Sequence, residues 1–157
     1  MEHYDKTIDL VSAALDEEEF RYHVCADRSA IEMRITGEHA VFPTLIAVFG
    51  EEPKRGLGVC VRIPIVVPEK QRVQMAEAIT RANYDLSYGC FELDMSDGEL
   101  NFRTAMPIYD GEVTQKQVSF LVHRAWSTAD DYTRAFLRLV YAEDLSPAEV
   151  IAEVEMD

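Results

Sequence analysis

Apolar and polar residues alternate on both sides of the dipeptide Asp97-Gly98, and this pattern constrains the fold more than any other part of the chain. Asp-Gly is a preferred two-residue hairpin loop, because both loop positions of a type I′ turn take positive φ. The facing pairs would be Met95 with Leu100, Leu93 with Phe102 and Phe91 with Thr104 on one face, and Asp94 with Asn101 and Glu92 with Arg103 on the other. The pattern predicts a hairpin with one apolar and one charged face, in which Leu93 and Phe102 are buried neighbours.

A second hairpin is predicted across Asp27-Arg28, where alternation with a period of two appears on both sides. The facing pairs would be Val24 with Ile31, Tyr22 with Met33, and Phe20 with Ile35. Two longer strands follow, over residues 40–49 and 57–67, and both carry apolar residues on their two sides. Strands of this kind are usually covered on both faces. Pro43 has no N–H for a strand ladder, so its end of the strand should lie at a sheet edge or a bulge.

Apolar residues at helical spacing predict helices over residues 4–16 and 69–83, the second of which begins after Pro68. A third helix should begin at Thr114 as N-cap, and the polar stretch 127–131 predicts a break before a further helix over residues 132–141. Ser146 and Glu149 have the spacing of a capping box that opens a short terminal helix. The buried stripes would consist of Tyr4, Ile8, Val11 and Leu15, then Met75, Ile79 and Ala82, then Val118, Leu121, Val122 and Ala125.

The order of predicted elements is α-β-β-β-β-α-β-β-α-α. Strands that are joined by tight turns are antiparallel, so the fold class is α+β, with an antiparallel sheet of about five to six strands and helices packed on one face. A chain of 157 residues without an internal repeat or a linker is expected to form a single domain over residues 1–157.

The net charge of −14 argues against nucleic acid or an anionic membrane surface as a partner, because phosphate contact needs clustered Lys and Arg. No apolar run approaches the ~18 residues that span a bilayer, and the acidic, amphipathic start MEHYDKTIDL does not resemble a secretory signal. The expected location is the cytoplasm. The acidic run 16–19 is interpreted as a solvated turn that ends the first helix, with an acidic docking patch as the alternative.

Motifs that would carry chemistry are absent from the sequence. The histidines and cysteines lack the spacing of metal ligands, there is no P-loop, G-x-G-x-x-G or G-x-S-x-G, and no carboxylate pair stands out as an acid/base couple. Cys25, Cys60 and Cys90 are expected to be small core residues rather than disulfide partners or catalytic thiols. Trp126 is expected in the core rather than on a ligand platform. The prediction is a protein that is not an enzyme and has no cofactor or metal.

The segment from Val67 to about Pro107 resembles the YbjN family of small bacterial proteins. The matching stretches are Val67-Pro68-Glu69, Ala82-Asn83-Tyr84, Gly89-Cys90-Phe91-Glu92-Leu93 and Asp97-Gly98-Glu99-Leu100, together with the helix around residues 118–126 and Asp130-Asp131-Tyr132. The resemblance implies a fold like that of type III secretion chaperones, which are small acidic homodimers that hold extended segments of a client. It also implies a role in sensory-transduction regulation. It brings no catalytic residues, and the step from this fold to a chaperone function is an analogy.

Three functions remain open. The first is a non-catalytic protein-binding module, chaperone-like or a regulatory adaptor. The second is a small-ligand sensor, which a large apolar cavity with converging polar groups would favour. The third is an enzyme with an unrecognised site, which two titratable groups with perturbed pKa in one cleft would favour.

The surplus of apolar surface on strands 40–49 and 57–67 predicts a homodimer, because a monomer whose helices cover one face would leave a large apolar patch. The alternative is a monomer whose C-terminal helices cover the second face. Guided by the chaperone resemblance, the expected interface is the helix 69–83 with the strand 57–67. Its candidate residues are Leu57, Val59, Val61, Ile63, Met75 and Ile79.

Overall fold

The structure of the chain is a computed structural model that describes residues 2–51, 54–108, 113–142 and 144–156, with the side chains of residues 2–5 left out. It is an α+β fold with one six-stranded antiparallel sheet of strand order β1-β2-β3-β4-β6-β5. The predicted fold class is therefore confirmed. The elements are α1 (Glu2–Glu17), β1 (Tyr22–Val24), β2 (Ala30–Thr36), β3 (Val41–Phe49), β4 (Gly56–Val66), the 3₁₀ turn η1 (Glu69–Gln71), α2 (Arg72–Tyr84), β5 (Cys90–Leu93), β6 (Glu99–Pro107), α3 (Gln115–Tyr141) and α4 (Pro147–Met156).

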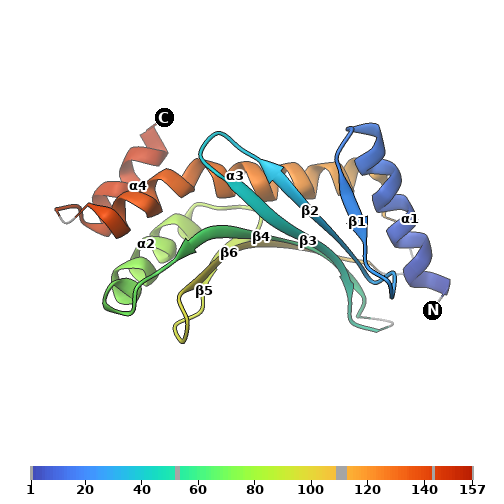
Figure 1. Cartoon of the computed structure of the whole chain (residues 1–157), viewed down its shortest axis with the longest axis horizontal. Helices are drawn as coiled ribbons and strands as arrows, with labels where there is room; N and C mark the ends of the chain where they lie inside the picture. The colour runs from blue at the N-terminus through green and yellow to red at the C-terminus, as the bar shows by residue number, and fades with distance from the viewer. Residues whose placement is uncertain (1, 52–53, 109–112, 143, 157) are drawn as a thin grey trace.

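All four helices lie on one side of the sheet (Figure 1). Helix α3 runs along the curved sheet and packs on β4 and β6, while α1 contacts it near one end and α2 and α4 gather at the other. The core lies between α3 and the sheet, and it includes Phe42, Ile46, Phe102 and Phe136. The other side of the sheet carries no helix among the described residues.

The sheet is therefore covered on one face only. In β3 the buried residues alternate with Val41, Leu45 and Phe49, whose side chains are 40–48% exposed. In β4, Arg62, Pro64 and Val66 are exposed in the same way and alternate with the buried Ile63 and Ile65. The alternative in which the C-terminal helices cover the second face of the sheet is not observed, because α3 and α4 both lie on the core side.

The hairpin β5–β6 has its predicted faces but not its predicted register. Phe91 faces Phe102 and Leu93 faces Leu100, a shift of two residues. The loop is longer than the expected Asp97-Gly98 pair. A two-residue shift keeps every side chain on its face, so Leu93 and Phe102 still share the core side, with Leu93 partly buried. Met95 does not pair with Leu100 but lies exposed in the loop.

The side chain of Asp94 accounts for this longer loop. Its carboxylate accepts hydrogen bonds from the backbone N–H and the hydroxyl of Ser96, at 2.7 and 2.6 Å. The backbone N–H of Gly98 then donates to the Asp94 carbonyl at 2.8 Å, with Gly98 at φ 86°. A loop of four residues built around a turn of this kind is a common alternative to the two-residue hairpin.

The first hairpin, β1–β2, has the predicted register, with Tyr22 facing Met33 and Val24 facing Ile31. Phe20 precedes β1 and does not extend the ladder. Pro43 on β3 pairs with Arg34 on β2, and the pairing of β3 with β4 begins only at Thr44. Its end of the strand thus lacks a β4 partner, as the missing N–H predicted.

Helix α3 is continuous over 27 residues, so the break predicted at residues 127–131 is wrong. The polar residues there do not leave the helix. Thr128 and Asp130 are buried, and further along the helix the hydroxyl of Thr133 bonds to the carbonyl of Ala129 at 2.6 Å. Asp130 instead reaches across to the β2–β3 turn, where its carboxylate accepts the backbone N–H of Glu38 at 2.5 Å and that of His39 at 2.8 Å. Gly37 makes room, because a Cβ there would lie 2.5 Å from this carboxylate.

The other helix ends agree with the prediction. Thr114 and Gln117 form a capping box at the start of α3, and Ser146 and Glu149 form the same hydrogen bonds at the start of α4. Helix α1 ends at the acidic run in a Schellman motif, with the Phe20 N–H bonded to the Leu15 carbonyl. The described stripe residues are buried: Ile8, Val11, Leu15, Met75, Ile79, Ala82, Val118, Leu121, Val122 and Ala125. The side chain of Tyr4 lies outside the described residues.

The outer edge of β5 is closed by Asn83 on α2. Its amide oxygen accepts the backbone N–H of Phe91 at 2.7 Å, and its amide nitrogen donates to the Phe91 carbonyl at 3.1 Å. One side chain thus replaces the hydrogen bonds of a neighbouring strand, and an edge strand with satisfied backbone groups is a poor template for aggregation.

We expect Asn83→Ala to lower the free energy of unfolding by about 1–3 kcal/mol, because two partly buried backbone groups lose their partner. Thr80→Ala is the matched control on the same helix, since the exposed Thr80 hydroxyl bonds only to the carbonyl of Ala76. Its effect should stay within about 0.5 kcal/mol. Urea unfolding of the two variants measures both values, and equal effects would contradict the role given to Asn83.

Candidate functional site

The uncovered side of the sheet is called the open face. It consists of the residues that alternate with the core residues along five strands. They include Glu32, Arg34 and Thr36 on β2, Val41, Pro43, Leu45, Ala47 and Phe49 on β3, Gly58, Cys60, Arg62, Pro64 and Val66 on β4, Cys90 and Glu92 on β5, and Glu99, Asn101, Arg103, Ala105 and Pro107 on β6.

Apolar residues of β3 lie along the centre of the open face, and the surface there is hollowed. A groove of about 480 Å³ crosses β2, β3, β4 and β6, and Pro43, Leu45 and Cys60 are among the residues that line it. At the end of β3 the ring of Phe49 lies over Gly56 and Gly58 of β4. A Cβ on Gly56 would be 2.5 Å from the ring, and one on Gly58 would be 3.2 Å from it. The glycines of β4 therefore let an aromatic side chain lie flat on the sheet.

Charged residues surround this centre in equal numbers. The open face has three glutamates and three arginines, so its formal charge is zero, whereas the chain carries −14. Arg62 pairs with Glu99 at 2.9 Å, and Arg103 pairs with Glu92 at 3.0 Å. These exposed pairs add little to stability, but they neutralise the face. The remaining two, Glu32 and Arg34, make no ion pair within the part of the chain that the structure describes.

The cysteines are half-buried and are not core residues, so that prediction is wrong. Cys60 and Cys90 lie on the open face, on either side of Arg103 in one row across the sheet. Burial raises the pKa of both thiols, and it outweighs the opposite effect of Arg103. Burial also raises the pKa of Cys25. A thiol with a raised pKa is a weak nucleophile at neutral pH.

The six residues predicted to form an interface all lie in the core. Leu57, Val59, Val61, Ile63, Met75 and Ile79 are 0–9% exposed. They face the helices, so their side chains are not available to a partner. The open face is formed instead by the residues between them on β4. Arg62 is the signal in the sequence that could have identified this side, because the one charged residue in an otherwise apolar strand marks the side that faces solvent.

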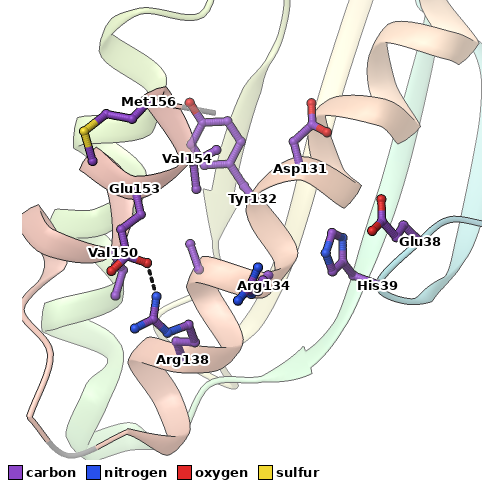
Figure 2. A pocket seen from close by; sticks show the side chains of 11 residues that line it. Glu38, His39, Asp131, Tyr132, Arg134, Arg138, Val150, Glu153, Val154 and Met156 are labelled. Carbon is purple, nitrogen blue, oxygen red and sulfur yellow. Dashed lines mark hydrogen bonds and ion pairs between the residues drawn. The ribbon is translucent and has the colours of Figure 1, made fainter.

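A second depression lies between α3, α4 and the β2–β3 turn, with a volume of about 780 Å³ (Figure 2). Both acidic and basic side chains line its wall. Arg138 of α3 pairs with Glu153 of α4, and the ring of His39 lies 3.3 Å from the Asp130 carboxylate. The depression is open to solvent and its wall is largely polar, so it is not the apolar cavity that a small-ligand sensor would need.

Two adjacent residues of this depression have perturbed pKa values. Burial and the charge of Asp130 raise the pKa of Asp131, and burial together with the repulsion of Glu155 raises that of Tyr132. Figure 2 shows the two side chains pointing away from each other, Tyr132 toward α4 and Asp131 away from it. They do not converge on a point where a substrate atom would sit, as acid/base catalysis requires.

Other side chains that attract attention are accounted for structurally. His123 hydrogen-bonds to Glu18 on the molecular surface. Trp126 is partly buried and packs against the core. Among the described residues, no group of three or more His, Cys, Asp and Glu is placed to hold a metal ion, and no helix is long and apolar enough to cross a bilayer. The open face therefore stands out as the candidate functional surface.

Comparisons with known proteins agree with the resemblance of the central segment. The model of the YbjN family, described as "Putative bacterial sensory transduction regulator", matches residues 7–138. A crystal structure of YbjN from E. coli, described as a putative transcription regulator, superposes with a TM-score of 0.57 and 17% identity. That match covers 78% of this chain and 85% of the other, and at this identity it shows a shared fold. No curated protein sequence matches the chain.

Proposed function

This chain belongs to the YbjN family, and from that premise we propose that it is a non-catalytic regulatory module that binds another polypeptide on its open face. The observation that carries the proposal is the uncovered side of the sheet. Val41, Leu45 and Phe49 are exposed there although they are apolar. A contiguous apolar patch with a polar rim is typical of a protein-binding surface.

The composition of the open face favours a polypeptide over other partners. Arginines beside an apolar centre are typical of protein interfaces, in which Arg is enriched. A nucleic-acid site would need a net positive surface, but here each arginine has a glutamate to match it. A regulator with this surface acts through protein contacts and not by holding DNA. The cytoplasmic location stays a prediction.

The curvature of the sheet suits an extended segment of the partner. The groove crosses four strands, so a chain that lies in it passes several side chains in turn. This is the adaptor or chaperone-like activity that the resemblance implies. Small-ligand sensing and catalysis have less support, because the depression between α3 and α4 is open and its titratable groups do not converge.

We expect Leu45→Asp to abolish capture of the partner, since a carboxylate in the middle of the groove must be desolvated when a polypeptide covers it. Val73→Asp is the matched control: Val73 is 73% exposed on the outer side of α2, far from the open face. The measurement is affinity capture from the native cytoplasm with the wild type and both variants, followed by mass spectrometry. Circular dichroism checks that both variants are folded.

The wild type and Val73→Asp should retain one shared set of proteins that Leu45→Asp loses. If Leu45→Asp captures the same set, the open face is not the binding surface. If all three proteins capture nothing above a bead control, the protein-binding function itself is wrong.

A further inference from the structure

We infer that the open face also binds itself: a second copy of this chain covers it in a two-fold symmetric contact when no other partner is present. The inference rests on the proposed function, because it takes the open face as a binding surface. It goes beyond that function by naming one occupant. A partner polypeptide would then have to displace the second copy.

Charge is the first reason. Two copies carry −14 each, so most of their surfaces repel each other. The open face, with three glutamates and three arginines, is a neutral region of an acidic molecule. Two copies that meet through this face bring together surfaces of zero net charge and keep their acidic helical sides apart.

The second reason is the position of Glu32 and Arg34. Both are exposed on the same face of β2, two residues and therefore roughly 7 Å apart along the strand. They have opposite charges, and neither makes an ion pair within the described residues. In a two-fold contact, residue i meets residue j and j meets i. An axis that passes between them places Glu32 of each copy beside Arg34 of the other, so both charges gain a partner at once.

The third reason is what such an axis would bury. Leu45 faces Glu32 across the β2–β3 ladder, and Pro43 faces Arg34. Glu32 and Arg34 thus line the groove together with the apolar Leu45 and Pro43. A contact centred on this axis places the ion pairs near its middle and covers Leu45 and Pro43 beside them. A specific dimer needs at least about 1,000 Å² of buried surface in total.

Charge reversal tests this pairing. Glu32→Arg alone places two arginines beside each other at both contacts, and Arg34→Glu alone does the same with two glutamates. Each variant should dissociate at least about tenfold more readily than the wild type, because like charges in an interface cost free energy. An equimolar mixture of the two variants restores both pairs and should form a heterodimer. The double variant Glu32→Arg/Arg34→Glu should also form a dimer.

The measurement is molar mass by light scattering over a range of protein concentrations. Glu77→Arg is the control, because Glu77 is exposed and pairs within α2, away from the open face. The wild type and this control should have twice the 17.9 kDa of a single chain. A wild-type mass of 17.9 kDa at tens of micromolar, or a mixture of the two single variants that remains monomeric, would overturn the inference.

This experiment separates the inference from the proposed function, because it uses the purified chain alone. If the chain is monomeric while partner capture is lost only in Leu45→Asp, the function stands and self-association fails. If the charge-reversal mixture dimerises while nothing is captured, self-association stands and partner binding fails. Dimers that persist in both single variants would place the interface elsewhere and contradict the pairing of Glu32 with Arg34.

Discussion

Replacement of Phe102 by alanine is expected to lower the free energy of unfolding by about 3–5 kcal/mol. The ring is fully buried on the core side of β6. It meets the ring of Phe91 edge-on at a centroid distance of 4.8 Å, and it fills the space beside Gly89, where a Cβ would lie 2.8 Å from it. Alanine would leave a cavity that these neighbours cannot fill without moving.

Phe120→Ala is the control for this prediction. Phe120 is also an aromatic residue in an edge-on pair, with Tyr88, but its side chain is 46% exposed on α3. Its replacement should cost less than about 1.5 kcal/mol, the upper range of such a pair. Guanidinium unfolding compares the two variants. If Phe102→Ala is no more destabilising than Phe120→Ala, the placement of Phe102 in the centre of the core is wrong.

The second large effect is expected from Asp130→Ala, which should lower the free energy of unfolding by about 2–4 kcal/mol. The carboxylate of Asp130 holds the β2–β3 turn by the N–H groups of Glu38 and His39. Hydrogen bonds to a charged group are worth about 1.5–3 kcal/mol each, and their loss here leaves two donors in a partly buried place. Gly37→Ala should have an effect in the same direction, because its new Cβ would clash with the carboxylate.

The neighbouring residue gives a matched control. Asp131 carries the same side chain one position later, but the residue is largely exposed. Partial desolvation of its carboxyl group, together with the charge of Asp130, raises its pKa. A carboxyl with a raised pKa in the folded state is disfavoured as an anion at neutral pH, so Asp131→Ala should cause no loss of stability. The same chemical denaturation measures both. Equal losses for the two variants would mean that Asp130 is not the residue that holds the turn.

Period and turn chemistry were sufficient to predict where most elements lie. The register of β1–β2 follows from the alternation around residues 27–28, and the capping residues Thr114 and Ser146 mark real helix starts. These features are local, so the sequence carries them in full. The faces of β5 and β6 were also predictable, because a period of two survives an even shift in register.

One error, the register of β5–β6, has a local cause in the loop after Asp94, and the others concern contacts between distant parts of the chain. The polar stretch around Asp130 was read as a break, but Asp130 has its partners more than 90 residues away, in the β2–β3 turn. In the same way, Leu57 and Val59 were assigned to an interface because the sequence does not say which side of β4 the helices cover. The surplus of apolar residues on the strands 40–49 and 57–67 did indicate a candidate surface. The residues that form it are the exposed ones, which alternate along β4 with the buried residues that were chosen.

The length and position of α3 also affect how the protein can be made. All six strands lie before residue 108, whereas the helix that covers β4 and β6 occupies residues 115–141. Chains are synthesised at about 5–20 residues per second, so the strands leave the ribosome on the order of seconds before their cover. During that interval β4 and β6 lack their cover on the core side. The core between α3 and the sheet can therefore close only after the last strand has been made and α3 has emerged.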